Sequence, residues 1–146
     1  MKLTFKKLRE NAVIPSRATK DSAGVDLCAC LDEPVTLQSG ERMLIPTGLA
    51  VEPDRTDVAL LAFPRSGLAS KYGISMSNCV GVIDSDYRGE LKMPLINHGS
   101  EPFTVENGMR IAQLVVTPIL FPEIDTADTL SDTERGEGGF GSTGIK

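Results

Sequence analysis

Short stretches of β-branched and aliphatic residues recur along the chain, and glycine, proline or small polar residues bound each of them. Short apolar runs separated by regular turn signals are typical of strands in a β-sandwich or β-barrel. The pattern therefore predicts an all-β fold. The expected strands cover residues 3–8, 25–29, 35–38, 42–45, 48–52, 58–63, 91–97, 103–105 and 110–121.

Turn residues and one helical segment complete this prediction. Leu-Gln-Ser-Gly-Glu at 37–41 and Glu-Asn-Gly-Met at 106–109 look like hairpin turns. A short helix is expected over residues 66–72, with Ser66 as its N-cap and Gly73 as its stop. No internal repeat interrupts the pattern, so we expect a single β domain with one helix.

The overall composition fits one soluble domain and excludes several classes of function. A length of 146 residues suits a single core. No apolar run approaches the roughly 20 residues of a membrane helix, and the N-terminus lacks the apolar core of a signal peptide. A net charge of −5 disfavours the nucleic-acid backbone as a partner. We therefore expect a cytoplasmic protein that binds neither membrane nor nucleic acid.

By composition the chain divides into three parts. Residues 1–121 hold all the expected strands and form the predicted β-barrel domain. Residues 122–134 are acidic and polar, as in a linker. Residues 135–146 are rich in glycine, which cannot hold a regular element, so they predict a flexible C-terminal arm. The arm also carries Arg135 and Phe140, so a binding role and a plain disordered end both stay open.

The three cysteines point to reduced thiols, because their number is odd and no secretion signal precedes them. Cys28 and Cys30 could form half of a metal site, since alternate residues of a strand share a face. No second Cys or His pair accompanies them, and His98 is the chain's one histidine. Two small apolar residues on a half-buried strand are the favoured interpretation.

Two polar segments interrupt the apolar pattern, and their residues suit ligand binding or catalysis. Arg65 and Ser66, with the first amides of the expected helix, could bind a phosphate, but a capped helix with a solvated arginine is the simpler alternative. Within residues 81–89, a strand is expected to enter a tight hairpin, with Asp84 at its end and Tyr87 on the returning arm. A carboxylate beside an aromatic ring suits a general base next to a sugar or a base, although an ordinary polar turn fits equally.

Two further polar residues stand inside apolar strands. Gln113 needs a hydrogen-bond partner, which could be a ligand, a water or a neighbouring backbone group. Asp26 could hold another site residue in place or bond a local turn. Neither residue indicates a function alone.

Each of these polar residues and the arm belongs to one of five segments, at residues 23–27, 65–69, 81–89, 108–114 and 135–144. Taken together, and in their order along the chain, the five segments resemble the motifs of the trimeric dUTPase family. The resemblance implies a jelly-roll-like β-barrel of the dUTPase β-clip type. It also implies a homotrimer whose sites are shared between subunits, with the C-terminal arm closing over a neighbour's site. The implied activity is hydrolysis of dUTP to dUMP and pyrophosphate by attack of water on the α-phosphorus. This reaction would limit uracil in DNA and supply dUMP for dTMP synthesis.

The resemblance assigns roles in the base and sugar pocket to matching positions. Asp84 would activate the attacking water, and Tyr87 would lie against the deoxyribose and exclude a 2′-hydroxyl. The Asn78 side chain would read uracil together with the nearby backbone, and Lys92 would lie on the returning strand. That backbone is formed by Gly81, Val82 and Ile83.

The remaining assignments concern phosphate, the arm and metal. Asp26 would be a supporting carboxylate, and Phe140 would stack over uracil. Mg²⁺ would be held mainly by substrate phosphates and waters, with no direct protein ligand expected. Phosphate contacts are implied for Arg65, Ser66, Gly67, Gln113, Arg135, Ser142 and Thr143, and Gly141 would bind substrate beside them.

Two rivals to this interpretation remain open. A dCTP deaminase has the same barrel but needs a proton-transfer glutamate where this chain has Pro94. A catalytically inactive nucleotide-binding relative would keep the fold but would not require Asp84. Ammonia release from dCTP would favour the first rival, and a folded protein without turnover the second.

Overall fold

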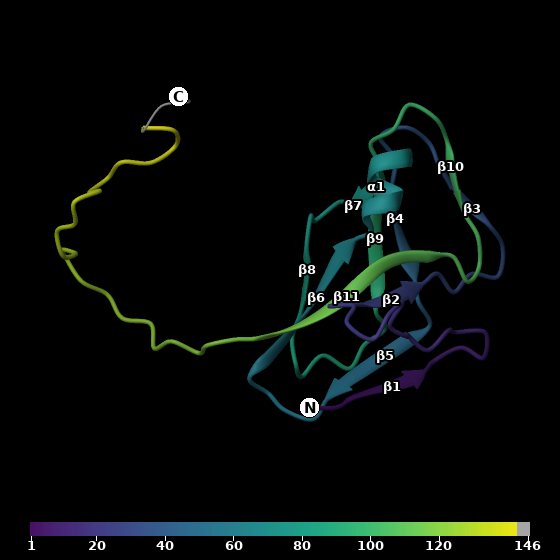
Figure 1. Cartoon of the computed structure of the whole chain (residues 1–146), viewed down its shortest axis with the longest axis horizontal. Coiled ribbons are helices and arrows are strands. Elements are labelled where there is room, and N and C mark those ends of the chain that lie inside the picture. The colour runs from purple at the N-terminus through teal and green to yellow at the C-terminus, as the bar shows by residue number, and fades with distance from the viewer. Residues whose placement is uncertain (143–146) are drawn as a thin grey trace.

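The computed structural model describes residues 1–142 and is built mainly from short strands (Figure 1). Within these residues eleven strands and one helix form, which confirms the predicted all-β fold with one short helix. In chain order they are β1 (Leu3–Lys7), β2 (Val25–Cys28), β3 (Val35–Leu37), β4 (Arg42–Pro46), β5 (Leu49–Pro53), β6 (Val58–Pro64), α1 (Ser66–Tyr72), β7 (Ile74–Met76), β8 (Gly81–Ile83), β9 (Lys92–Asn97), β10 (Phe103–Val105) and β11 (Arg110–Pro118).

Antiparallel pairing organises the strands of residues 1–142 into four small sheets. The largest has the order β2-β11-β6-β8, and the next has the order β4-β9-β7. The other two pair β1 with β5 and β3 with β10. Most neighbours within a sheet are far apart in sequence, so the chain crosses repeatedly between sheets, as in a jelly-roll barrel.

The predicted hairpins were wrong in the strands that they join. The turns themselves form: the Glu41 amide donates to the Gln38 carbonyl at 3.0 Å, and the Met109 amide to the Glu106 carbonyl at 3.1 Å. However, each turn joins strands that belong to different sheets. The segment 81–89 behaves likewise, because β8 pairs with β6 whereas β9 pairs with β4 and β7.

The core lies between the two larger sheets. Leu60 and Leu114 point into it from one sheet, and Ile45 and Leu95 from the other, and each is almost completely buried. Asn97 is buried beside them, and its side-chain amide donates to the carbonyls of Leu37 and Glu101 at 3.0 and 2.8 Å. A packed and hydrogen-bonded core of this kind gives the site a rigid base.

Helix α1 has the predicted bounds but a different start. Ser66 is its first residue, and Arg65 is the N-cap, in extended conformation and without a side-chain capping bond, so the prediction of Ser66 as N-cap was wrong. Gly73 ends the helix as expected, because its φ of 70° lies in the left-handed region. Arg65 therefore stands at the junction between β6 and α1.

Cys28 and Cys30 are both buried, as expected for small apolar residues. Strand β2 ends at Cys28, and Cys30 packs in a separate cluster with Ala12 and Leu49. Burial raises the pKa of the Cys28 thiol, and the Asp26 carboxylate raises it further against the opposing effect of Arg110 and Arg65. The thiol is therefore held in its protonated, unreactive form.

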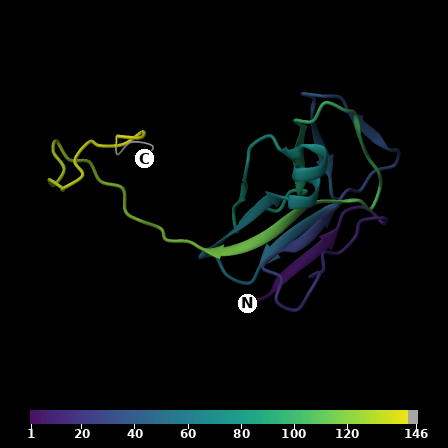
Figure 2. The same ribbon diagram turned by 45° about the horizontal axis from the view of Figure 1, so that its top comes forward.

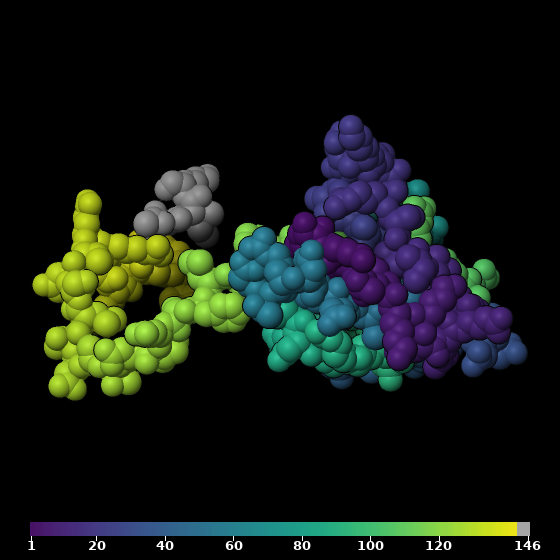
Figure 3. Space-filling view, turned by 90° about the horizontal axis from the view of Figure 1, so that it is seen from below, coloured from purple at the N-terminus to yellow at the C-terminus, as the bar shows by residue number. Residues whose placement is uncertain are grey.

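The C-terminal segment leaves the barrel at the end of β11 and runs away from it (Figures 1 and 2). The predicted strand 110–121 was three residues too long, because β11 ends at Pro118. The space-filling view also shows this segment as a separate projection beside the barrel (Figure 3). Within residues 1–142 no helix is long and apolar enough to cross a membrane.

Candidate functional site

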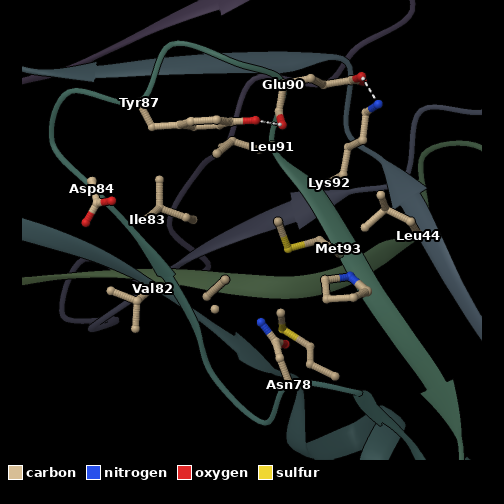
Figure 4. Close-up of a pocket in the computed structure, with 14 residues that line it drawn as sticks. Leu44, Asn78, Val82, Ile83, Asp84, Tyr87, Glu90, Leu91, Lys92 and Met93 are labelled. Atoms are coloured by element: carbon tan, nitrogen blue, oxygen red, sulfur yellow. Dashed lines mark hydrogen bonds and ion pairs between the residues drawn. The ribbon is translucent and has the colours of Figure 1, made fainter.

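A cavity of about 430 Å³ opens between the edge of one large sheet and the face of the other (Figure 4). This volume is typical of small-molecule sites. Seven predicted site residues line it: Asn78, Gly81, Val82, Ile83, Asp84, Tyr87 and Lys92. The other lining residues are Leu44, Ala62, Met76, Glu90, Leu91, Met93 and Pro94.

One end of the cavity has an open backbone next to an amide side chain. Gly81 is buried at the start of β8, and a Cβ there would lie 3.3 Å from Ala62 Cβ and 3.6 Å from Asn78 Nδ2. The missing side chain lets a flat ring approach the β8 backbone. Val82 is 67% exposed, and by strand alternation its side chain points to the face of β8 opposite those of its neighbours.

The other end carries the carboxylate and the aromatic ring (Figure 4). Asp84 directly follows β8 and is exposed at the mouth, and the Tyr87 amide donates to its carbonyl at 3.2 Å. The turn is anchored to the barrel because Ser85 Oγ donates to the Thr56 carbonyl at 3.1 Å. Asp84 is therefore a solvent-reaching acceptor on a fixed turn.

A second cluster of predicted residues surrounds Asp26, at the junction of β6 and α1. Asp26 Oδ1 lies 3.0 Å from Arg65 Nε, and its Oδ2 lies 3.1 Å from Arg110 Nη1. The Asp26 side chain is only 19% exposed. Arg65 also donates to the Arg110 carbonyl at 3.2 Å. Asp26 thus bridges two arginines, rather than bonding a local turn, and fixes the direction of the Arg65 guanidinium.

Gln113 lies in β11 beside this cluster. Its Nε2 donates to the Pro64 carbonyl at 3.0 Å, so the alternative of a neighbouring backbone partner is the one observed. Ser66 and Gly67 are exposed at the start of α1. Four side chains and one helix start therefore converge on the same end of the barrel.

The two clusters do not form one site within a single chain. In the β6–β8 ladder Ile83 pairs with Leu60, so Asp84 lies at the level of Ala59, six residues before Arg65. At about 3.3 Å per residue, the backbones of Asp84 and Arg65 are about 20 Å apart along β6. The Asp26 cluster also contributes nothing to the cavity lining.

The arm lies apart from both clusters. Arg135 Nε donates to the Gly138 carbonyl at 2.7 Å, and the Ser142 amide to the Gly139 carbonyl at 2.9 Å, so within residues 135–142 the hydrogen bonds are local. The Phe140 ring is completely exposed. Arg135, Phe140, Gly141 and Ser142 are thus not brought to the cavity of their own chain, and Thr143 lies outside the described residues.

Two residues of the site, Arg110 and Glu90, were not predicted from the sequence. Arg110 stands in the fourth motif, but only the pairing of β11 with β2 places it beside Asp26. Glu90 gave no signal beyond its place after Gly89, and its side chain nevertheless bonds the amide of Gly48 at 2.9 Å. The positions of Arg110 and Glu90 both depend on contacts between segments that are far apart in the sequence.

The fold and the cavity define a class of protein: a jelly-roll β-barrel with a cavity of small-molecule size beside an exposed carboxylate. Comparison with protein families makes the class specific, because the dUTPase family model matches residues 10–144. The chain belongs to the dUTPase family.

Curated relatives agree over nearly the whole chain. A deoxyuridine 5′-triphosphate nucleotidohydrolase of Desulfitobacterium hafniense is 50% identical over 145 residues, which is 99% of this chain and 96% of the relative. One of Neisseria meningitidis serogroup A is 54% identical over 133 residues, covering 91% and 89%. Identity and coverage of this size agree with membership of the same family.

Solved structures are similar as well. A mutant dUTPase of Staphylococcus bacteriophage 80alpha, with dUpNHpp, superimposes with a TM-score of 0.89 at 31% identity and covers 99% of both chains. A mutant dUTPase of phage phi11 of S. aureus has a TM-score of 0.80 at 26% identity, over 90% of this chain and 100% of that one, and is described with a structural Mg(II) ion. These likenesses confirm the predicted jelly-roll β-clip fold.

Proposed function

We propose that Asp84 activates the water with which this enzyme hydrolyses dUTP to dUMP and pyrophosphate. The dUTP hydrolysis itself follows from family membership and from the relatives at about 50% identity. The proposal for Asp84 is supported by one arrangement above all. A nucleoside-sized cavity has a solvent-reaching carboxylate at one end and an open backbone with an amide at the other.

The chemistry follows from this arrangement. Asp84 accepts a proton from a water whose oxygen attacks the α-phosphorus, while the bond to the leaving pyrophosphate breaks. Proton acceptance by a positioned carboxylate needs only hydrogen-bonding reach of the water. Tyr87 stands at the same end and offers its ring to the deoxyribose, where a 2′-hydroxyl would collide.

Uracil recognition is assigned to the opposite end of the cavity. The Asn78 amide and the backbone of Gly81, Val82 and Ile83 offer hydrogen bonds to its polar edge. Lys92 lines the cavity from the neighbouring strand β9, with its Nζ 3.6 Å from Glu90 Oε2. Met76 and Met93 form an apolar floor that supports the ring. Buried hydrogen bonds that a wrong base leaves unpaired discriminate strongly.

We further propose that the complete site needs more than one subunit. Arg65 and Gln113, with Ser66 and Gly67, are assigned to substrate phosphates, yet their cluster lies about 20 Å from Asp84 within one chain by the strand spacing. A phosphate bound by Asp84 and Arg65 together would require Arg65 of a second copy. This supports a homotrimer with shared sites, as the family resemblance implies.

The C-terminal arm is assigned to the same shared site. Residues 1–121 would form the catalytic barrel, 122–134 an acidic linker, and 135–146 an arm that closes over a neighbouring subunit. Apolar side chains of the linker and arm, such as Leu130 and Phe140, are at least 90% exposed, and such groups are typical of a surface that another surface covers. Phe140 would then stack on uracil, while Arg135, Ser142 and Thr143 would bind phosphate, with Gly141 between them.

Mg²⁺ fits this site as a partner of the substrate rather than of the protein. Among the described residues, no three His, Cys, Asp or Glu side chains gather to hold a metal. Both oxygens of Asp26 face arginines, so this cluster suits a phosphate group rather than a bare cation. Bound to the triphosphate, Mg²⁺ would neutralise its charge and orient it. The site residues would hold the phosphates and waters around it.

Replacing Asp26 by Asn is expected to raise the KM for dUTP by about 10- to 100-fold, because Arg65 loses the charge that orients it. Removing one partner leaves Arg65 and Arg110 facing each other without a carboxylate. Steady-state kinetics of pyrophosphate release measure the effect. The matched control is Asp32→Asn, which removes a carboxylate that is 89% exposed and 4.0 Å from Arg9. Equal KM values for the two variants would contradict the role of Asp26.

Pyrophosphate release from dUTP with Mg²⁺ tests the proposed function against its rivals. Ammonia release from dCTP would indicate a deaminase, which Pro94 in the cavity wall disfavours because its ring transfers no proton. A folded protein with no turnover would indicate a binding protein. A cytoplasmic location stays a prediction from the sequence.

A further inference from the structure

The ring of Tyr87 lies directly against Gly89. A Cβ built on Gly89 would lie 2.3 Å from Tyr87 Oη, 2.4 Å from its Cζ and 2.8 Å from its Cε2. No L-residue other than glycine leaves room for the ring in this position. The backbone of Gly89 does not lie in the left-handed region, so its conformation alone does not require glycine. The space taken by the tyrosine ring is what explains the glycine here.

The hydroxyl end of the same ring is fixed by Glu90. Tyr87 Oη donates to the Glu90 carbonyl at 3.1 Å (Figure 4). The side chain of Glu90 is only 16% exposed; its Oε1 accepts the Gly48 amide at 2.9 Å, and its Oε2 lies 3.6 Å from Lys92 Nζ. Glu90 therefore ties the acceptor of the tyrosine to the connection between β4 and β5.

The next residue strengthens this attachment. The Leu91 amide donates to the Leu49 carbonyl at 2.7 Å, and Thr47 Oγ1 donates to the Leu91 carbonyl at 2.7 Å. Leu91 and Thr47 are buried. The acceptor for the Tyr87 hydroxyl is thus part of the rigid barrel rather than of a free loop.

We propose that Gly89 and Glu90 are positioning residues that determine the preference for deoxyribose by locking the Tyr87 ring in place. The inference rests on the proposed function of Tyr87 beside the sugar. Steric exclusion of the 2′-hydroxyl requires the Tyr87 ring to stay in one position. A ring free to rotate about its χ1 bond would move aside at a small cost in free energy. Gly89 leaves room for the ring in its observed position, and the Glu90 carbonyl holds its hydroxyl.

Tyrosine fluorescence can test the position of the ring separately from catalysis. The chain has no tryptophan and two tyrosines, so in a Tyr72→Phe background Tyr87 is its one strong fluorophore. Tyr72 packs its ring on Phe103 at a centroid distance of 5.2 Å, and phenylalanine preserves that pair. Tyr87 is 45% exposed in the structure. In this background, Gly89→Ala is expected to displace the ring and raise its exposure further, seen as stronger quenching by acrylamide.

The kinetic test compares kcat/KM for dUTP and UTP in the same variants. Gly89→Ala is expected to narrow the dUTP-to-UTP ratio by roughly tenfold or more, mainly through faster turnover of UTP relative to dUTP. Glu90→Gln keeps an acceptor for the Gly48 amide and should retain the ratio, whereas Glu90→Ala should reduce it. A folded Gly89→Ala protein with an unchanged ratio and unchanged quenching would overturn the proposal.

The outcomes separate this proposal from the proposed function. If Gly89→Ala does not fold, the two Glu90 variants provide the test. Equal dUTP-to-UTP ratios of kcat/KM in Glu90→Ala and Glu90→Gln would then overturn the proposal. If the unsubstituted protein releases pyrophosphate from dUTP and from UTP equally well, the role of Tyr87 fails and this inference with it. If the unsubstituted protein releases none from dUTP, the proposed function itself fails, while quenching still shows whether Gly89 holds the ring.

Discussion

Replacing Asp84 by Asn is expected to lower kcat for dUTP by about 10²- to 10⁴-fold, the usual contribution of a positioned general base. An amide of the same shape cannot accept the proton of the attacking water. Binding should change little, because Asp84 lies at the mouth of the cavity and the base-reading groups lie at its other end. Initial rates of pyrophosphate release give kcat, and calorimetry with dUpNHpp gives the affinity.

Asp54→Asn is a suitable control for this substitution. Asp54 is another exposed carboxylate, on the loop after β5, and takes no part in the cavity lining. It should keep the kcat of the unsubstituted protein. An Asp84→Asn protein with full kcat would show that another group activates the water.

Deleting residues 135–146 is expected to lower kcat/KM for dUTP on the order of 10²-fold, the scale of loss when positioning of a substrate fails. The described part of the arm, residues 135–142, makes only local hydrogen bonds, so we expect its removal to leave the hydrogen bonds and the core of the barrel intact. The oligomeric mass by light scattering and the midpoint of thermal unfolding should therefore be unchanged. Near-normal turnover by the shortened chain would show that the arm is dispensable.

Mixing these two inactive chains tests whether sites are shared. An assembly of Asp84→Asn chains with arm-deleted chains can contain a site that takes an intact Asp84 from one chain and an intact arm from another. Co-refolding should therefore restore part of the activity, whereas each protein alone stays impaired. The same rate in the mixture as in the separate proteins would count against shared sites.

Local structure was predictable from the sequence because it depends on neighbouring residues. The helix Ser66–Tyr72 has the expected bounds since its stop, Gly73, is a local signal. The strand partners were not predictable. A turn such as 37–41 fixes only the reversal of the chain, and in this barrel the following strand pairs across to another sheet. Local turn chemistry does not distinguish a hairpin from a crossing between sheets.

The candidate site shows the same division. Residues close together in sequence, such as Asp84 and Tyr87, were predicted to share a site and line one cavity. The position of Asp26 depends on partners far along the chain, Arg65 and Arg110, which only the pairing of β2, β11 and β6 brings together. The Gln113 partner was left open for the same reason, because the Pro64 carbonyl belongs to the adjacent strand.

Selective hydrolysis of dUTP is the central claim, and one panel tests it directly. Pyrophosphate release is measured with Mg²⁺ on dUTP, dTTP and UTP at equal concentrations. The cavity predicts rapid release from dUTP, with kcat/KM for dTTP and UTP lower by about 10²-fold or more, because a methyl group meets the β8 backbone and a 2′-hydroxyl meets Tyr87. Equal rates on all three nucleotides, or no release from dUTP, would contradict it.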